Sequence, residues 1–575
     1  MASRTAVRSA APAPRPPAIV PRWFRPLLAA LAVIYVVGVF SRASADSDTP
    51  WHLASGRFIW QNHRLPVPDP FAYTSDMGAL LYAGELQTRH FNLTHEWGME
   101  LLYYLVYAGT GYAGLVLFRS LLLALFCAMT GWLAWRRSQS FYRALAAGIV
   151  AQRLAVPFSA DRAFLITFVL VTVTVAVYET RRGRWWLPLL FLIWANCHAG
   201  FIMGWAVAGV YSAEALFLRL RGKPLADERT IWTVSALSVL ASGVNPNGFG
   251  VIEVLRYYRL SPMQASLLEW QAPHWWPPSW FSLLMVSTAL VLLWARRRVR
   301  PADWLLFAAF GGASALATRN TIFIGFIAPV LLATYIPLWK RTEPALLQYT
   351  AAALLLLGIV SGFALHAMFQ LRQAEWIYPK EAADFLLAHH VTGRMFNKYE
   401  EGGYLMWRLW PQEKVFIDGR ALNDSVWWDY MHMAYNADFN GKTTQDLLRK
   451  YGVEVIVMNG FDHNGQLLFL AAALADPNQK DWKLVYEDAK SLIYMRQTPP
   501  GVTPLNSLAA FSGLESECDW NIEHGMAPEC ARSLGDMYMR VGDLNRARRW
   551  VGVYLNVNST DPQAQAMWRQ LSAVR

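Results

Sequence analysis

Long apolar runs recur through the first two thirds of this sequence, and they constrain its fold more than any other feature. Most of them approach the roughly 20 residues that a helix needs to cross a bilayer. The first run is 26–40, and we expect about eleven spans in all. The other runs are 112–134, 144–158, 163–179, 185–199, 201–218, 230–246, 279–295, 302–318, 320–338 and 346–368. The sequence therefore predicts a polytopic α-helical membrane protein.

The composition supports this class and argues against nucleic-acid binding. The chain is 54% hydrophobic and only 16% charged, which is unusual for a soluble protein. Its formal charge of +11 comes from short Lys/Arg clusters between apolar runs, without a long basic stripe. That placement indicates membrane topology, and we expect no nucleic-acid partner.

The basic clusters predict the orientation of the chain in the membrane. They occupy alternate connections on the side of the N-terminus, and Lys/Arg-rich loops remain in the cytoplasm. They are Arg136, Arg137 and Arg143; Arg181, Arg182 and Arg184; Arg219, Arg221 and Lys223; Arg296, Arg297, Arg298 and Arg300; and Lys340 and Arg341. Loops 43–98 and 245–278, and everything after 369, then lie on the opposite side. We expect a bacterial inner-membrane protein with a cytoplasmic N-terminus and a periplasmic C-terminal domain.

The N-terminal segment has two interpretations. Ala43-Ser44-Ala45 resembles a signal-peptidase site behind a short apolar run, so cleavage competes with an uncleaved first anchor. We favour the anchor. The predicted organisation is a cytoplasmic tail at 1–25 and a membrane domain at 26–369, in which 43–98 forms a large first periplasmic loop.

From residue 370 the pattern changes to short strand-like and helix-like runs. Runs 414–417, 453–458 and 484–486 favour strands, and 380–390, 442–451 and 464–475 favour helices. We predict an α/β domain at 370–496, a linker at 497–529 and a helical hairpin at 530–575. The hairpin matches tetratricopeptide spacing at Leu534, Gly535, Tyr538, Gly542, Ala547 and Pro562. A single repeat cannot bury a core alone, so it docks on the preceding domain or binds a protein partner; ordinary helix packing is the alternative.

The four cysteines fall into two groups. Cys127 and Cys197 lie inside apolar runs, as small core residues do. Cys518 and Cys530 lie in the polar C-terminal region, where an oxidising compartment favours a disulfide between them.

Candidate chemistry begins directly after the first span. Asp46, Asp48 and His52 place two carboxylates and an imidazole at the membrane surface, and Glu96 adds a carboxylate at the end of the same loop. Placing ionisable groups at the membrane surface costs desolvation free energy, so such groups are often functional. A carboxylate there can act as a general base or bind Mg²⁺ or Mn²⁺. The alternative is that Asp48 caps a helix that starts at Thr49-Pro50.

Two arginines interrupt apolar runs on the same predicted face. Arg162 follows Asp161, an acidic partner that could share a metal with Asp48, and Arg319 lies between Thr318 and Asn320. A guanidinium at that depth can hold a lipid phosphate. Snorkelling to the interface is the alternative for both.

These residues carry a resemblance to the GT-C glycosyltransferase superfamily. Asp46-Ser47-Asp48-Thr49-Pro50-Trp51-His52 looks like its acidic motif after the first transmembrane helix, with Asp48 the best match. The segments Trp194–Phe201 and Asn245–Gly248 are similar to stretches of uncharacterised bacterial GT-C-like proteins. The resemblance implies an enzyme that transfers a sugar from a polyprenyl-phosphate donor, with Asp48 as base or metal ligand and Arg319 or Arg162 at the phosphate.

The resemblance to oligosaccharyltransferases is closest in the C-terminal domain. Glu401–Leu405 and Lys414–Arg420 look like the region around their Trp-Trp-Asp-Tyr-Gly motif. Trp427-Trp428-Asp429-Tyr430 spells most of it, but in the wrong place, and we interpret it as chance. An Asn-X-Ser/Thr acceptor is therefore not expected. Two other functions remain open: a non-catalytic envelope scaffold, and a transporter of lipid-linked sugar, which charges inside helices such as Arg153 would favour.

Overall fold

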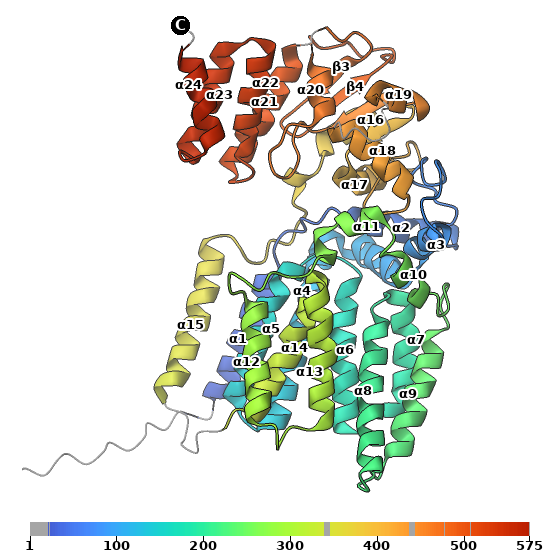
Figure 1. Cartoon of the computed structure of the whole chain (residues 1–575), viewed down its shortest axis with the longest axis vertical. Helices are drawn as coiled ribbons and strands as arrows, with labels where there is room; N and C mark the ends of the chain where they lie inside the picture. Colours follow the sequence, from blue (N-terminus) through green and yellow to red (C-terminus); the bar gives the residue numbers. More distant parts are fainter. Residues whose placement is uncertain are drawn as a thin grey trace, which may run out of the picture.

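The computed structural model describes residue 21 and residues 23–337, 345–435, 443–476, 478–506 and 508–573. Most of the predicted N-terminal tail, including Arg4, Arg8, Arg15 and Arg22, lies outside these residues. So does the predicted basic connection at Lys340 and Arg341. Figure 1 shows a bundle of helices below, a layer of short helices above it, and a C-terminal domain on top.

Each predicted apolar run contains a helix of the bundle. These are α1 (Phe24–Phe40), α4 (Trp97–Ser138), α5 (Phe141–Ala155), α6 (Phe164–Thr180), α7 (Leu187–Cys197), α8 (Phe201–Leu220), α9 (Glu228–Ser242), α12 (Trp280–Trp294), α13 (Pro301–Leu316), α14 (Thr321–Tyr335) and α15 (Ala345–Ala364). Local sequence explains several helix starts. For example, α12 opens with a capping box in which Ser279 and Ser282 bond to each other's backbone N–H.

Three helical stretches in the described residues are long and apolar enough to cross a membrane. They are Glu85–Ser138, Phe201–Leu220 and Ala345–Ala364. Shorter apolar helices occupy Phe24–Phe40, Phe164–Thr180 and Trp280–Trp294. A helical membrane architecture is therefore supported, whereas the number of eleven spans stays a prediction.

The centre of the bundle is helix α4, which packs against α5, α6 and α14. Phe126 of α4 lies in this core with Phe168, Phe323 and Phe326, all nearly fully buried. Helix α15 contacts α1 and stands at the edge of the bundle (Figure 1). Helix α4 is bent at Gly111, where φ of +63° departs from helical geometry.

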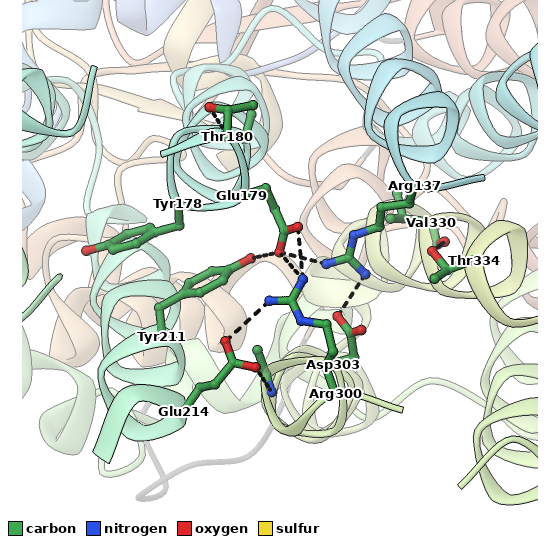
Figure 2. A network of polar contacts seen from close by, with 12 residues as sticks. Arg137, Tyr178, Glu179, Thr180, Tyr211, Glu214, Arg300, Asp303, Val330 and Thr334 are labelled. Carbon is green, nitrogen blue, oxygen red and sulfur yellow. Dashed lines mark hydrogen bonds and ion pairs between the residues drawn. The ribbon is translucent and has the colours of Figure 1, made fainter. Parts of the chain in front are cut away.

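A network of ion pairs ties several bundle helices together at one end (Figure 2); its carboxylates are largely buried, and Arg300 is 43% exposed. Arg137 at the end of α4 donates to Glu179 of α6 and to Asp303 of α13, each at 2.8 Å. Arg300 also contacts Glu179, and it reaches Glu214 of α8. One ion network therefore links four helices and fixes their relative positions.

A layer of short helices separates the bundle from the C-terminal domain (Figure 1). It contains α2 (Thr49–Asn62), α3 (Glu85–Thr94), α10 (Val251–Tyr257) and α11 (Pro262–Ser266). Single turns of 3-10 helix are η1 (Val156–Phe158), η2 (Arg184–Trp186), η3 (Leu268–Trp270), η4 (Thr318–Asn320) and η5 (Glu375–Ile377). The two predicted long loops, 43–98 and 245–278, supply the short helices of this layer and η3.

The C-terminal domain contains a four-stranded sheet in the order β1-β2-β4-β3. Its strands are β1 (Met395–Asn397), β2 (Val455–Met458), β3 (Lys483–Glu487) and β4 (Leu492–Met495). β1 and β2 are parallel, and the other pairs are antiparallel. The helices of this domain are α16 (Lys380–Ala388), α17 (Tyr399–Leu409), α18 (Asp424–Tyr435), α19 (Thr444–Lys450) and α20 (Phe469–Ala475).

One predicted strand is wrong. Residues 414–417 do not join the sheet; Val415 instead forms an isolated parallel bridge with Ala72 of the first loop. Its N–H donates to Phe71 O, and its carbonyl accepts from Tyr73 N–H. Val415 thus pairs with a residue over three hundred positions earlier in the chain, and not with the strands of its own domain.

The predicted linker at 497–529 is also wrong in part, because Leu508–Glu523 forms helix α21. It is followed by α22 (Glu529–Val541), α23 (Leu544–Val557) and α24 (Pro562–Ala573), which pack in sequence. A disulfide joins Cys518 of α21 to Cys530 of α22. This α-helical segment shares a hydrophobic core with the α/β domain, to which Phe511, Leu534 and Trp550 contribute. Its tetratricopeptide character stays a prediction.

Candidate functional site

The predicted acidic segment lies at the junction of the bundle and the C-terminal domain. Asp48 is at the N-cap position of α2, yet its side chain makes no capping hydrogen bond. Its carboxylate faces the guanidinium of Arg162 instead, with Asp48 Oδ2 2.9 Å from Nη1. Helix capping is therefore not what this carboxylate does in the structure.

Asp46 and Arg162 form a bidentate pair beside Asp48. Arg162 Nε donates to Asp46 Oδ1 at 2.9 Å, and Nη2 donates to Oδ2 at 2.8 Å. Asp46 Oδ1 also accepts the backbone N–H of Asp48 at 2.9 Å. Burial alone would raise the pKa of the Asp46 carboxyl, but Arg162 outweighs burial and holds that pKa below its ordinary value.

Asp48 is shifted in the opposite direction. Burial outweighs the attraction of Arg162 and, with repulsion from Asp46, raises the pKa of Asp48 to about 7. Glu269 adds a smaller repulsion of the same sign. Two neighbouring carboxyls therefore have different protonation behaviour: Asp46 stays ionised, and Asp48 exchanges its proton near neutral pH.

Asp161, the third predicted carboxylate, pairs with a different arginine. Its Oδ2 accepts from Arg119 Nη1 of α4 at 2.8 Å, and both side chains are almost fully buried. Arg119 also donates to Phe40 O at 3.2 Å and to Arg42 O at the end of α1. Asp161 thus fixes the start of the acidic segment, since Arg119 links it to the last turn of α1.

His52 and Glu96 come together on the other side of α2. His52 Nδ1 lies 3.5 Å from Glu96 Oε2, and Glu96 Oε1 lies 2.7 Å from His95 Nε2. Burial lowers the pKa of His52 to about 4 despite the attraction of Glu96. The His52 imidazole is therefore neutral near pH 7, and its approach to Glu96 is not an ion pair.

Arg319 lies at a more open part of the same junction. Its Nη1 is 3.2 Å from Glu269 Oε1, and its guanidinium lies 4.4 Å from the ring centre of Trp270. The Arg319 side chain is 29% exposed and the Glu269 side chain 41% exposed. Of the two predicted phosphate-binding arginines, Arg319 is thus the one with a single, solvent-accessible carboxylate partner.

The C-terminal domain covers the acidic segment at close range. A Cβ at Gly419 would lie 2.5 Å from Asp48 Oδ1, and one at Gly403 would lie 2.8 Å from the carbonyl oxygen of Ser47. Tyr378 Oη donates to Asp46 O at 2.8 Å. Only residues without a side chain permit this approach at 403 and 419, so the domain forms one wall of the site.

A cavity of about 410 Å³ opens next to Asp46. Its apolar lining includes Val39, Pro157 and Trp376, and the exposed Arg42 lies at the same opening. The cavity is bordered by the end of α1, by η1 and by the chain that follows α15. Asp46 is the member of the acidic pair that lines it.

The residues present do not fit the predicted divalent cation. No group of three or more His, Cys, Asp or Glu side chains able to hold a metal occurs among the described residues. Asp48 and Asp161, the two predicted ligands, each face an arginine. Mg²⁺ and Ca²⁺ need several oxygen ligands that converge on one point, and here a guanidinium occupies that position at each carboxylate.

Sequence reasoning missed two residues of this site. Arg119 is a single charge within the apolar run 112–134, a signal that could have identified it. Glu269 was noted only with Trp270, in a stretch similar to uncharacterised bacterial GT-C-like proteins, because nothing in the sequence places it beside Arg319. Arg153, which was proposed as a charge inside a helix, is exposed.

The Trp427–Tyr430 run is part of the domain's interior. Trp427 and Tyr430 are buried in its hydrophobic core. Asp429 Oδ2 accepts a hydrogen bond from Tyr451 at 2.7 Å. Trp427 and Tyr430 also contact Tyr399, whose ring centre lies 5.0 Å from that of Trp427. The interpretation of the motif match as chance stays a prediction.

Comparison with solved structures defines the class of fold. The chain is similar to the archaeal oligosaccharyltransferase AglB from Archaeoglobus fulgidus in complex with an inhibitory peptide and a dolichol-phosphate. The TM-score is 0.50 at 10% sequence identity, over 85% of this chain and 77% of that chain. The chain therefore shares its overall fold with this oligosaccharyltransferase structure.

Two further structures from the same organism agree. The A. fulgidus oligosaccharyltransferase tethered with an acceptor peptide containing the NVT sequon gives a TM-score of 0.50 at 11% identity, over 86% of this chain and 77% of that chain. The apo form gives the same score and identity over 85% and 77%. No protein-family model and no curated protein matches the chain. At these identities the similarity concerns the fold, and function must come from the site.

Proposed function

We propose that this chain is a membrane glycosyltransferase that moves a sugar from a polyprenyl-phosphate donor to an envelope acceptor. The observation that carries the proposal is the acidic pair Asp46 and Asp48, held by Arg162 where the bundle of an oligosaccharyltransferase-like fold meets its C-terminal domain. Buried ionisable groups with separated pKa values are typical of sites that transfer protons.

In this proposal Asp48 is the general base. A base is most effective when its pKa lies near the working pH, and burial raises the pKa of Asp48 to about 7. The ionised carboxylate accepts the proton of the acceptor hydroxyl as the acceptor oxygen bonds to the sugar C1. The bond between C1 and the donor oxygen breaks, and its electron pair leaves with the lipid phosphate.

Arg319 is assigned to the leaving phosphate. Its one carboxylate partner, Glu269, is partly exposed at 3.2 Å and can be exchanged for a phosphate oxygen. Because a guanidinium stays charged and binds phosphate through two N–H groups, it stabilises the charge that develops as the donor bond breaks.

The cavity beside Asp46 is the proposed path of the donor lipid. Val39, Pro157 and Trp376 offer an apolar wall, and Arg42 offers a positive charge that can pair with a lipid phosphate. In a bacterial inner membrane with the N-terminus in the cytoplasm, this reaction takes place at the periplasmic face. The helices α21 to α24 take no part in the proposed transfer reaction. We propose that they bind another envelope protein.

The deciding experiment is Asp48→Asn, assayed for sugar transfer with a polyprenyl-phosphate sugar in purified form. The substitution keeps the size of the side chain and removes its charge. Because Asp48 does not cap α2, no cap is lost. Loss of a positioned base lowers the rate about 10²- to 10⁴-fold, and we expect a loss of that size with normal abundance in the membrane.

Asp76→Asn is the matched control, since Asp76 is an exposed aspartate of the same first loop. It should transfer sugar as the wild type does. Near-normal transfer by Asp48→Asn would reject the catalytic assignment. In that case the envelope-scaffold alternative, acting through α21 to α24, becomes the better account.

A further inference from the structure

The cation that pairs with Asp46 and Asp48 is a side chain of the same protein, Arg162. All three guanidinium nitrogens of Arg162 face carboxylate oxygens: Nε and Nη2 face Asp46, and Nη1 faces Asp48. The contacts lie between 2.8 and 3.0 Å. Each of the three guanidinium nitrogens thus has a carboxylate within hydrogen-bonding distance, and the Nε/Nη2 edge is used in a bidentate manner.

A second arginine compensates the third carboxylate of this region. Arg119 is 1% exposed and pairs with Asp161, whose side chain is fully buried. The three carboxylates Asp46, Asp48 and Asp161 thus face two guanidiniums, and the arrangement is bound to the backbone at the end of α1 through Arg119. Burying carboxylates requires such compensation, because an unpaired buried charge is strongly destabilising.

Little room remains for a metal at Asp48. Its Oδ2 faces Arg162, and its Oδ1 lies against Gly419, where a Cβ would come within 2.5 Å. Ser47 Oγ also donates to this oxygen, at 3.4 Å. Oxygen ligands bind a divalent cation at about 2.0 to 2.6 Å and must converge on it from several directions. The backbone of residue 419 and the guanidinium close those directions.

We infer that Arg162 is a built-in cation, which performs at this acidic pair the electrostatic role of a bound divalent metal, so that the chain transfers sugar without a metal ion. The part of this inference that concerns sugar transfer rests on the proposed function, whereas the part that concerns metal binding does not. Asp46 is a positioning residue in this arrangement, because its bidentate contact aims Nη1 at Asp48. Arg162 is consequently committed to the carboxylates, and phosphate binding falls to Arg319.

The binding arm of the test measures Mn²⁺ directly, by electron paramagnetic resonance of the purified full-length protein. Wild type should not bind Mn²⁺, whereas Arg162→Ala should bind one ion, since removal of the guanidinium leaves two carboxylates side by side. Arg162→Ala with Asp46→Asn should lose that ion again. Stoichiometric Mn²⁺ binding by wild type that Asp48→Asn removes would overturn the inference.

Arg162→Lys is the variant that separates charge from folding. It keeps a cation beside Asp46 and Asp48 but loses the bidentate geometry, so it should not bind Mn²⁺ and should retain more transfer than Arg162→Ala. Mn²⁺ binding by Arg162→Lys equal to that of Arg162→Ala would contradict the assignment, because a lysine charge would then not have protected the site.

The activity arm uses chelator and chemical rescue. Sugar transfer by wild type should be unchanged by EDTA, and Arg162→Ala should lose about 10²-fold or more, as for removal of one charge-stabilising donor. Added guanidinium or Mn²⁺ should restore part of that loss. Loss of wild-type transfer in EDTA, restored by Mn²⁺, rejects the inference. If wild type shows no transfer under any condition, the proposed function fails, and the Mn²⁺ binding result still decides the role of Arg162.

Discussion

Arg420 of the C-terminal domain lies 2.7 Å from Asp69 of the first loop, and both side chains are 1% exposed. The same guanidinium contacts Asp418 at 2.6 Å. The pair joins segments that are 351 residues apart in the sequence. It therefore fixes the domain on the loop layer just beside Gly419, the residue that covers Asp48.

Arg420→Met should remove the ion pairs with Asp69 and Asp418 and destabilise the protein. It leaves Asp69 and Asp418 buried without a cation, and breaking a buried pair from one side costs about 3 to 5 kcal/mol. We expect a clear drop in the midpoint of thermal unfolding of the detergent-solubilised protein. Arg449→Met is the control, because Arg449 is 64% exposed and pairs with an exposed Asp446; it should change stability by less than about 1 kcal/mol. Equal midpoints for the two variants would contradict the docking role.

The helical part of the fold was predictable because an apolar helix is determined by the local sequence. An apolar run such as 201–218 becomes α8 (Phe201–Leu220) with little dependence on distant residues. The short elements were not. β1 has three residues, Met395–Asn397, too few for a pattern. Helix α21 was hidden by the Pro, Ser and Gly residues around it, although Phe511, Leu514 and Cys518 recur at helical spacing and are buried.

For the site, the sequence identified single residues but could not show how they pair. Asp46, Asp48 and Arg162 were all predicted, but separately. Asp48 was predicted as base or metal ligand, Asp46 as a second catalytic carboxylate, and Arg162 as a phosphate-binding residue. Arg162 is 116 residues from Asp46, and only folding shows that one satisfies the other. Pairing of distant residues in this way is set by tertiary packing, which no local pattern encodes.

Arg42→Glu should weaken binding of the lipid donor. The exposed Arg42 stands at the opening of the cavity next to Asp46, and a hydrogen bond to a charged group contributes about 1.5 to 3 kcal/mol. We expect KM for a polyprenyl-phosphate sugar to rise about tenfold or more, with kcat nearly unchanged. Arg64→Glu, the same charge reversal at an exposed site of the first loop, should leave KM as it is. An unchanged KM for Arg42→Glu excludes this cavity as the donor path.

Cys518 and Cys530 should be resistant to alkylation in membranes prepared without reductant. The structure joins them by a disulfide, which persists only on an oxidising side of the membrane. Cys127 and Cys197 are free thiols and provide the internal control, since both should be alkylated once the protein is denatured. Peptide mapping that finds all four cysteines alkylated before reduction would contradict both the disulfide and the predicted orientation.

Sugar transfer should increase with pH up to about pH 7 and then level off. Asp48 acts as a base only when ionised, and its pKa is raised to about 7, so the active fraction falls about tenfold for each pH unit below that value. Five groups face this carboxyl. Arg162, Asp46, Trp51 and Glu269 act on its charge, and its own charge acts on Tyr399. Arg162 remains protonated and Asp46 remains ionised through this pH range. The acidic limb of the pH–rate profile therefore reflects the ionisation of Asp48.

Glu269→Gln tests the assignment of Asp48 as the base, because it predicts the direction in which the pH profile should shift. Glu269 repels the ionised Asp48 and so raises its pKa; its removal should lower that pKa and move the acidic limb of kcat/KM to lower pH. The measurement is kcat/KM against pH for wild type and Glu269→Gln at constant ionic strength. A limb that moves to higher pH in the variant, or a wild-type profile that is flat through pH 7, would show that Asp48 is not the group whose ionisation governs transfer.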